Sequence, residues 1–436
     1  MKLNTKQIWL NLLILISVFT GHTLTGQTET STTETTVPVK QEKSIDSNDE
    51  GYNSVTLLMT VIELLRKYYV DKDKVKYEQL VTGALKGILS ELDPFCVYES
   101  PAVHRQTAQK FSGRLVGVGI VVMKAQDGSI RVVAPSGDDS PGFKAGILPD
   151  DLITQIDGRK TATMSIEECV TMMQGQPGTK VTLTIFRKTT GKVLTFVFNR
   201  SEIHTSPVPF NGVKVLNGNI GYIRLSLFSA ETGPAMDKAL EVLEKQNIKG
   251  IILDLRYNPG GLLSAAVDVC SRFIKDGELV IYTEGREKSN RVDINALKCY
   301  KNLELPLVIL VNNYSASGSE IVAGCLKDHK RAVLIGTKTY GKGSVQRIQP
   351  LPNGGAIRFT IAHYYTPGAK LIDGKGIEPD IEVPIPYNDS LHMSQQLAIY
   401  PGEIRPAKPG LMIDAELLRA AQILEGIIRF NESRTK

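Results

Sequence analysis

Three serines and one lysine have the residue types and spacing that nucleophilic catalysis requires. The serines alternate in the segment Ser315-Ala-Ser-Gly-Ser319, and Lys342 lies further along the chain between two glycines. A serine at the start of a helix lies where unpaired N–H groups and the helix dipole stabilise a developing oxyanion, but it also needs a base to remove its proton. Lys342, His329 and His363 are the candidates for that base.

The same segment also has a purely structural interpretation. Ser317 and Glu320, before an apolar helix, have the spacing of a capping box, and the other two serines are typical turn residues. Capping a helix does not prevent catalysis. Two familiar catalytic motifs are absent, because the sequence has no G-x-S-x-G and its only Ser-x-x-Lys is Ser433 to Lys436 at the C-terminus.

The segment around Lys342 resembles a phosphate-binding loop but departs from it at two points. Gly336-x-x-x-x-Gly341-Lys342 follows a predicted strand, as in a P-loop. Gly343 then occupies the position of the serine or threonine that would bind Mg²⁺. Prolines follow soon afterwards with no helical pattern before them, so the helix N-terminus that such a loop needs is missing. We therefore do not expect a nucleotide site.

Repeated strand–loop–helix units position these residues. Apolar runs at 250–255, 307–311 and 332–335 predict buried strands of a sheet that is covered on both faces. Such units bring their loops together at the carboxyl edge of a mostly parallel sheet, where α/β proteins bind ligands. The loops that follow these strands are Arg256–Gly261, Asn312–Glu320 and Gly336–Gln346.

A β-rich module is predicted over residues 106–202. Glycines at 117–119 lead into a β-branched strand, and further strands, a helix through Ile166–Met173 and a final hairpin follow. This order resembles a PDZ domain, most specifically in the run Ala145-Gly-Ile-Leu-Pro-Asp-Asp-Leu-Ile153, whereas the alternative is a plain β-sandwich. The resemblance implies that backbone N–H groups bind a free C-terminal carboxylate and that the peptide adds as a strand beside the helix. The implied peptide-binding residues are Gly117, Val118, Gly119, Ile120, Val170 and Met173.

The N-terminal segment has the pattern of an export signal. Lys2 and Lys6 precede an apolar run over residues 8–19, which is shorter than the ~18–20 residues that span a bilayer. We expect either a cleaved signal peptide or an uncleaved anchor that associates with the membrane through this run. The rest of the chain would then lie outside the cytosol, in the periplasm or on the outer face of the inner membrane. The polar stretch that follows lacks the apolar residues to fold and predicts a disordered tether.

Two amphipathic helices follow the tether. Leu58, Val61, Ile62 and Leu65 have helical spacing, and a second apolar stripe ends at Ile88 before Asp93-Pro94. Helices this small cannot bury both of their faces alone. We expect them to pack on a neighbouring domain or on a second copy of the chain, as in a homodimer.

The composition is that of a globular protein. Of 436 residues, 42% are hydrophobic and 22% charged, which excludes a wholly disordered chain, a collagen and a polytopic membrane protein. Lys plus Arg exceed Asp plus Glu only by 51 to 46, without a basic block, so we expect no nucleic-acid binding. The five cysteines are odd in number and form no C-x-x-C, which favours buried thiols over a zinc site or disulfides. They are Cys96, Cys169, Cys270, Cys299 and Cys325.

Five ordered sequence blocks identify a family resemblance. Over about residues 52–430 the chain resembles the carboxyl-terminal processing peptidases, the tail-specific serine peptidases with a PDZ domain. The order of N-terminal helices, PDZ domain, mixed α/β peptidase core and C-terminal helix also agrees with that family, and a multi-domain α/β protein is the expected fold class. The blocks are Gly221-Tyr-Ile-Arg-Leu-Ser-Leu-Phe-Ser229, Asp254-Leu-Arg-Tyr-Asn-Pro-Gly-Gly261, Ser315-Ala-Ser-Gly-Ser-Glu-Ile321, Thr339-Tyr-Gly-Lys-Gly-Ser-Val-Gln346, and Tyr364-Tyr-Thr-Pro367 with Gly374-Lys-Gly-Ile-Glu-Pro-Asp380.

This resemblance implies a Ser-Lys dyad. It makes Ser317 the nucleophile, Lys342 the general base, and Gln346 the residue that holds the lysine amine by a hydrogen bond. The oxyanion hole would be formed by Gly318 N–H and by the turn at Gly260 and Gly261. The lysine must be neutral to take a proton, so burial has to lower its unperturbed pKa of ~10.4. Asp328, a third relay residue in some accounts of the family, is interpreted as structural.

Two functions from different classes follow. The favoured one is an exported serine endopeptidase that recognises substrate C-termini through its PDZ domain and cleaves near them, with no metal or organic cofactor. The alternative is a PDZ-bearing envelope adaptor with an inert peptidase-like core. The expected parts are a signal peptide or N-terminal anchor at 1–26, a tether at 27–51, a helical region at 52–105, a PDZ domain at 106–202, a Ser-Lys peptidase core at 203–386 and a C-terminal helical region at 387–436.

Overall fold

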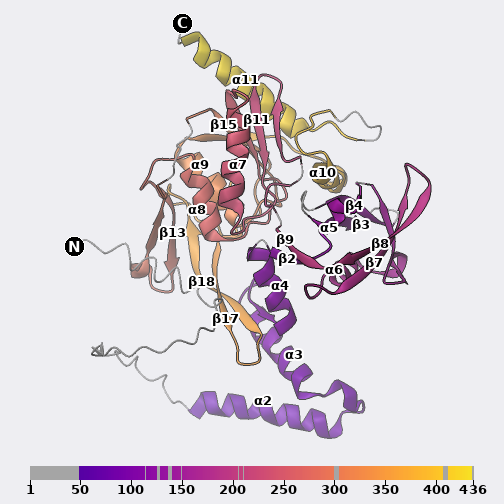
Figure 1. The fold of residues 1–436 in the computed structure, drawn as a ribbon. Coiled ribbons are helices and arrows are strands. Elements are labelled where there is room, and N and C mark those ends of the chain that lie inside the picture. The colour runs from indigo at the N-terminus through magenta and orange to yellow at the C-terminus, as the bar shows by residue number, and fades with distance from the viewer. Residues whose placement is uncertain are drawn as a thin grey trace, which may run out of the picture. The chain divides into compact units, whose positions relative to one another are not determined.

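The computed structural model describes most of the chain after the tether. The described residues are 49–112, 114–124, 128–135, 140–148, 150–204, 206–209, 211–298, 304–405 and 411–434. The predicted signal or anchor, its apolar run, most of the tether and Cys299 lie outside them. The described residues form two compact units, a smaller one from 49–102 and 346–360 and a larger one from within 103–345 and 361–434. Figure 1 labels their elements.

The predicted buried strands build a six-stranded sheet in the larger unit. Its order is β10-β11-β12-β15-β16-β19, and every neighbouring pair is parallel except β10 with β11. All residues of β11, β12 and β15 are buried, as expected for apolar strands covered on both faces. The carboxyl ends of β12, β15 and β16 therefore lie at one edge, where the three candidate loops begin. The bounds are β10 Val213–Leu216, β11 Ile220–Arg224, β12 Gly250–Asp254, β15 Leu307–Val311, β16 Ala332–Gly336 and β19 Ile381–Glu382.

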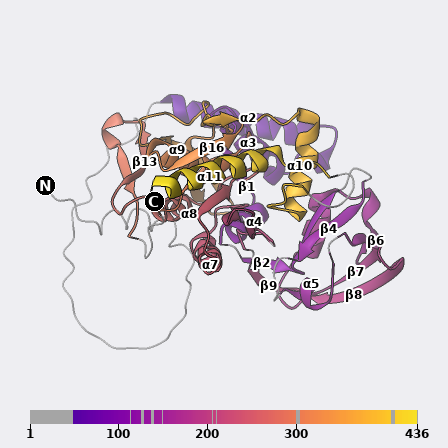
Figure 2. The same ribbon diagram turned by 90° about the horizontal axis from the view of Figure 1, so that it is seen from above.

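Helices cover both faces of this sheet. Alternate strand residues point to opposite sides, so Ile251 and Leu253 pack with α7, α8 and α9, whereas Ile252 packs with α11. Figure 2 shows α11 lying along the sheet, where it contacts β12, β15 and β16. α9 begins three residues earlier than predicted, because the polar Gly318–Glu320 segment forms its first turn. The bounds are α7 Thr232–Glu244, α8 Leu263–Ser271, α9 Gly318–Asp328, α10 Tyr387–Ile399 and α11 Ala415–Arg434.

Antiparallel strands that the sequence did not predict add to each unit. In the larger unit β13 pairs with β14 and with residues 362–365 of β18, and in the smaller unit β1 pairs with residues 356–358 of β18. Most residues of β17 and β18 are only partly buried, so the long apolar runs that marked the central strands are missing. The bounds are β1 Val97–Glu99, β13 Leu279–Gly285, β14 Val292–Asn295, β17 Ser344–Pro350 and β18 Ala356–Tyr365.

The β-rich module has the predicted order of elements. Its sheet runs β3-β4-β5-β7-β8, with β6 on β5, and β2 pairs separately with β9. Ser140 caps the short helix α5 by accepting a hydrogen bond from Phe143 N–H. The bounds are β2 Arg114–Gly117, β3 Ile120–Lys124, β4 Ile130–Pro135, α5 Pro141–Lys144, β5 Leu152–Ile156, β6 Arg159–Lys160, α6 Ile166–Met173, β7 Lys180–Arg187, β8 Lys192–Asn199 and β9 Ser201–His204.

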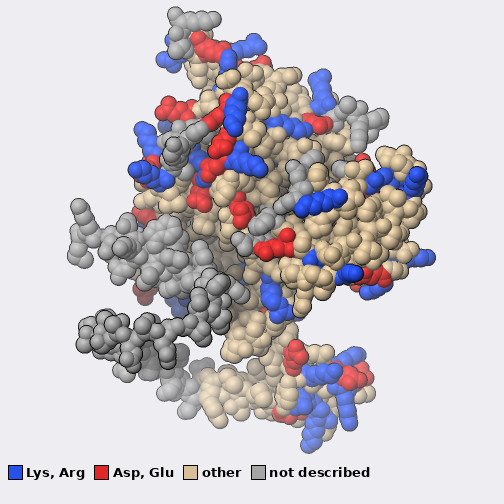
Figure 3. All heavy atoms as spheres, viewed as in Figure 1, with Lys and Arg blue, Asp and Glu red and all other residues tan. Residues whose placement is uncertain are grey.

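The N-terminal helices leave most of their predicted apolar stripe uncovered. In α2 (Asp49–Tyr68), Ile62 is buried, but Leu58, Val61 and Leu65 stay 38–44% exposed. The next helices are α3 (Tyr77–Ser90) and α4 (Pro101–Ser112). None of the helices in the described ranges is long and apolar enough to span a bilayer. Figure 3 shows that side chains of both charges are interspersed on the face it draws.

Candidate active site

The serine loop leaves only one of its three serines accessible. Ser315 and Ser319 are fully buried, and their hydroxyls donate to the carbonyl oxygens of Leu255 and Asn258 at 2.9 Å each. Ser317 is half-buried and directly precedes α9, with φ +53° and ψ −112°. A non-glycine residue in this region of φ and ψ is strained, and such strain concentrates at functional sites. The geometry therefore selects Ser317, a choice that residue types alone left open.

The glycine turn after β12 lies against this serine. A Cβ atom on Gly260 would lie 2.5 Å from Ala316 O and 2.7 Å from both Gly318 N and Ser317 Cβ, so only glycine fits there. Gly260 N–H donates to Asn258 Oδ1 at 2.9 Å. No hydrogen bond of the described residues uses the N–H groups of Gly318 or Gly261. Of the three predicted oxyanion-hole glycines, Gly260 thus provides the close packing and the other two have N–H groups available.

A buried carboxylate joins the serine loop to the lysine loop. Glu320 Oε2 accepts hydrogen bonds from the backbone N–H groups of Ser317 and Lys342 at 2.8 Å each. Its Oε1 accepts from Thr339 Oγ1 and Gly341 N–H at 2.6 Å each. Burial raises the pKa of Glu320, and the four hydrogen bonds oppose that rise. The first of the four is the capping bond that the sequence predicted, whereas the other three were missed because no local pattern shows which distant loop faces a buried glutamate.

Lys342 lies in a tightly packed turn. It is half-buried, and a Cβ atom on the following Gly343 would lie 2.1 Å from Asp373 N. Glycine is therefore required beside the lysine for the chain to pass. The backbone N–H groups of Lys342 and Ser317 donate to the same atom, Glu320 Oε2. The backbones of the candidate nucleophile and the candidate base are therefore held next to each other.

The two histidines differ in their suitability as a base. His329 follows the C-terminal end of α9, so the eleven residues of that helix, about 16 Å, separate it from Ser317, and one ring nitrogen lies 2.8 Å from Leu279 O. This position removes it as a partner of the serine. His363 lies in β18 with Nδ1 3.5 Å from Asp373 Oδ2, and Asp373 also accepts a hydrogen bond from Gly343 N–H. His363 is therefore close to the lysine loop and is tested below.

Gln346 and Asp328 have well-defined partners. Gln346 Nε2 donates to Phe95 O at 2.7 Å within the smaller unit, and its predicted bond to the lysine amine stays a prediction. Asp328 accepts from Thr366 Oγ1, from Gly368 N–H at 2.8 Å and from Lys370 Nζ at 3.2 Å. Three donors from one turn occupy this carboxylate, which supports its structural interpretation.

The six predicted peptide-binding residues of the β-rich module come together. Gly119, with φ +69°, packs against Ser140, and a Cβ atom on Gly117 would lie 3.2 Å from Met173 O at the end of α6. Ile120 and Val170 are half-buried, whereas Val118 and Met173 are buried in the core of the module. The half-buried pair is thus better placed than Met173 to touch a bound peptide.

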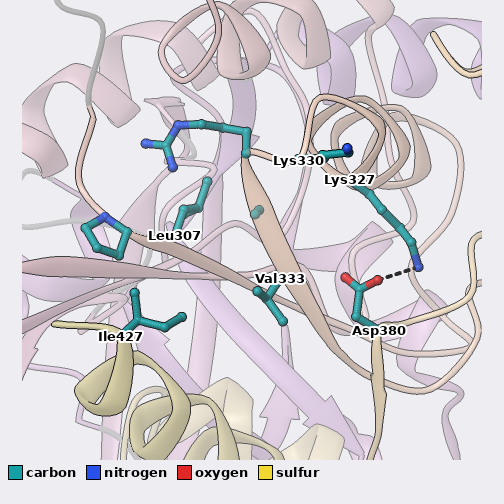
Figure 4. A pocket seen from close by; sticks show the side chains of 9 residues that line it. Leu307, Lys327, Lys330, Val333, Asp380 and Ile427 are labelled. Atoms are coloured by element: carbon teal, nitrogen blue, oxygen red, sulfur yellow. Dashed lines mark ion pairs between the residues drawn. The ribbon is translucent and has the colours of Figure 1, made fainter. Parts of the chain in front are cut away.

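A pocket of about 370 Å³ lies away from these loops, at the amino ends of β15 and β16 (Figure 4). Two of its three cations are engaged with protein groups, because Lys327 pairs with Asp380 at 2.9 Å and Arg331 donates to the carbonyl oxygens of Phe273 and Leu305. It belongs to the opposite edge of the sheet from Ser317 and takes no part in the site.

Two family models and several relatives match this chain. The model of peptidase family S41 matches residues 219–383, and a PDZ domain model matches residues 132–187. The chain is 38% identical over 352 residues to a carboxy-terminal-processing protease of Bartonella bacilliformis, with 79% of each chain covered. It is 34% identical over 352 residues to a carboxy-terminal processing protease of Bacillus subtilis, covering 80% of this chain and 69% of that protein.

The fold also has a counterpart among solved structures. A crystal structure described as that of an S41 protease from Bacteroides fragilis superposes with a TM-score of 0.51 at 18% identity, covering 84% of this chain and 97% of that one. This likeness concerns the fold alone. The relatives and the family models together show that this chain belongs to the carboxy-terminal-processing proteases of peptidase family S41, which are serine-type peptidases.

Proposed function

We propose that this protein is an exported serine endopeptidase that recognises substrate C-termini through its PDZ domain and cleaves near them with a Ser317–Lys342 dyad. The observation that carries the proposal concerns the Glu320 carboxylate. One of its two oxygens, Oε2, accepts hydrogen bonds from the backbone N–H groups of both dyad residues. The alternative, an inert adaptor, gives no reason for a buried carboxylate to hold these two loops together.

The chemistry follows from the groups around Ser317. Neutral Lys342 Nζ takes the hydroxyl proton as Ser317 Oγ bonds to the carbonyl carbon of the scissile peptide bond. The electron pair of the carbonyl bond moves to its oxygen, where N–H groups of Gly318 and Gly261 stabilise the negative charge. The C–N bond then breaks, and the leaving nitrogen takes the proton from Lys342. Water, deprotonated by the same lysine, hydrolyses the Ser317 ester and restores the enzyme.

Hydrolysis of an unfolded protein tests the dyad. We expect Ser317→Ala and Lys342→Ala each to remove nearly all turnover, and the double variant to cost little more, because residues that act as a unit are not additive. Lys375→Ala is the matched control, since Lys375 is an exposed lysine between two glycines in the same unit. Absence of turnover in the wild type would support the inert core, full turnover in Ser317→Ala would remove this serine as the nucleophile, and substantial turnover in Lys342→Ala would reassign the base.

Export and membrane association are the parts of the proposal that rest on sequence. The basic start and the apolar run at 8–19 support export, either with cleavage or as an anchor. Fractionation of cells that express the full chain should place it in the periplasm or on the outer face of the inner membrane. Recovery in the cytosol would overturn this part alone.

A homodimer is supported by the uncovered helices of the smaller unit. In α2, Val55, Leu57 and Leu64 are 52–66% exposed. The helix carries acidic and basic residues in similar number, so it offers no excess of positive charge to an anionic bilayer. A second copy of the same apolar surface fits better. Light scattering should give twice the chain mass for the wild type and for Val193→Glu, an equally exposed apolar site, but a monomer for Leu64→Glu. An unchanged mass in Leu64→Glu would refute this surface.

A further inference from the structure

A fully buried arginine lies at the start of the loop that approaches Ser317. Arg256 follows β12, and its guanidinium uses all five of its N–H donors. Two go to Asp254 at 2.7 and 3.0 Å, two to Asp414 at 2.8 Å, and one to Glu416 at 2.7 Å. Asp414 and Glu416 belong to the start of α11, so the C-terminal helix holds the residue from which the Arg256–Gly261 loop begins.

The buried cluster contains one carboxylate more than it contains arginines. Arg224 lies 3.5 Å from Asp254, so two guanidinium groups face three carboxyl groups. Burial opposes ionisation of Asp254, but Arg256 and Arg224 lower its pKa overall. Burial raises the pKa of Glu416 to about 7, above its ordinary value of 4.5. Glu416 is therefore the carboxyl that carries a proton as the pH falls below about 7, and the cluster is then neutral.

The second oxygen of Glu416 marks where that proton sits. Oε2 accepts from Arg256, whereas Oε1 is buried and has no hydrogen-bond partner among the described residues. A buried unpaired oxygen is costly when it is charged and tolerable as part of a neutral acid. Oε1 faces Gly336, the last residue of β16, where a Cβ atom would lie 3.2 Å from it. Glu416 thus lies beneath the starts of both the Arg256–Gly261 loop and the loop that carries Lys342.

We propose that Glu416, on the C-terminal helix, is a positioning residue for the reaction: in its neutral form it completes the cluster that holds Arg256 under the Arg256–Gly261 loop, and ionisation of Glu416 loosens that loop. This inference rests on the proposed peptidase function. Asp254 Oδ1 accepts from both the backbone N–H and the side chain of Arg256. A charge on Glu416 draws the guanidinium toward α11 and away from this anchor, and Gly260 and Gly261 move with it.

The groups that face Glu416 come from every element packed against it. β15 and β16 present Val311 and Gly336, which do not titrate. The charged and titratable groups are Asp254 and Arg256 of β12 and its loop, Arg224 and Tyr222 of β11, Asp414 before α11, and Tyr257. Burial opposes ionisation of Asp254 but its arginines hold its pKa below the ordinary value, and burial raises the pKa values of Tyr222 and Tyr257 above 10, so these three groups do not imitate an ionisation near pH 7.

The test compares wild type with Glu416→Gln, which keeps the shape of the neutral acid and cannot ionise. The measurement is kcat on a short peptide between pH 6 and 8. The pH dependence that Lys342 gives to kcat is the same in both proteins, so it cancels in the ratio of their kcat values. For a group that titrates near pH 7, the ratio of variant to wild-type kcat should rise about tenfold over this range, with KM unchanged. Glu425→Gln, at an exposed site of the same helix, is the control and should give a flat ratio.

The outcomes separate the inference from the function beneath it. Absence of turnover in the wild type would overturn the peptidase function and this inference with it. Two results would overturn the inference alone, provided that the wild type turns over. One is a Glu416→Gln to wild-type kcat ratio that does not change with pH, and the other is a Glu416→Gln kcat below that of the wild type at every pH. Glu416→Ala, which removes the acceptor for Arg256, should lower kcat at every pH, whereas Glu416→Gln rescues it. Equal kcat for the Ala and Gln variants would also refute the positioning role.

Discussion

Replacing Glu320 by glutamine tests whether one buried carboxylate holds the nucleophile and the base in register. The carboxylate accepts four hydrogen bonds, two on each oxygen. Glutamine keeps one acceptor oxygen and introduces an NH₂ group. The best orientation keeps the oxygen toward Ser317 and Lys342 and lets the Thr339 hydroxyl turn to accept. Gly341 N–H then faces the new N–H donor and loses its partner.

The size of the effect follows from that loss. A hydrogen bond to a charged group contributes about 1.5–3 kcal/mol, and the two that remain are weakened because their acceptor is neutral. A total of about 3 kcal/mol, if it is expressed in the transition state, lowers kcat roughly a hundredfold. Burial already raises the pKa of Glu320, so wild-type kcat should itself fall in acid as this carboxylate takes a proton.

The assay measures kcat and KM on a short peptide, together with urea unfolding of the same samples. Glu378→Gln is the control, because Glu378 is an exposed glutamate paired with Lys338 in the same unit. The expected result is a large loss in kcat with little change in KM for Glu320→Gln alone. A folded Glu320→Gln protein with wild-type kcat would refute the claim that this carboxylate positions the dyad.

Further predictions concern the base, the peptide groove, the glycine turn and the buried acid. A His363→Gln variant should keep the pH–rate profile of the wild type, and loss of a limb near pH 6.5 in that variant would instead identify a histidine base. A substrate ending in an amide should be captured roughly ten- to a hundredfold more weakly than its free acid, and equal cleavage rates for acid and amide would refute recognition of the C-terminus. Val170→Asp should impair the cleavage of tailed proteins more than the cleavage of short peptides. Gly260→Ala places a methyl group beside Gly318 N, so kcat should fall in a folded protein, and unchanged kcat would place the oxyanion elsewhere. The pKa of Glu416 rises from 4.5 to about 7 on folding, so its proton adds about 3 kcal/mol to the free energy of unfolding. This contribution is fully present below pH 4.5 and is lost as pH rises through 7. Glu416→Gln should remove this pH dependence from the unfolding free energy.

Sequence patterns were most informative where burial produces long apolar runs. The strands β12, β15 and β16 lie where the runs predicted them, because a strand covered on both faces has no polar alternation to obscure it. The half-buried strands β17 and β18 have no such run and were missed. Sequence therefore locates the centre of the sheet better than its borders.

Sequence patterns are similarly limited in predicting the single residues of the site. Residue types gave three equivalent serines and three candidate bases, and the family resemblance chose Ser317 and Lys342 among them. In the structure, the burial of Ser315 and Ser319 separates them from Ser317. Nothing local to Glu320 or Glu416 shows that each faces a loop far away in sequence, since such contacts exist only after the parallel strands have aligned.

The Glu320 bridge also has a consequence for the newly made chain. It connects loops that follow β15 and β16, and the turn against Ser317 follows β12, so three strands must be parallel and in register before the serine has its neighbours. Parallel pairing needs long crossover connections and forms slowly. In the proposed mechanism, a partly folded chain therefore has the Ser317 hydroxyl without its base or its oxyanion hole. Completion of the sheet would then be the step that activates the serine, and an immature chain would not cut itself or its neighbours before that step.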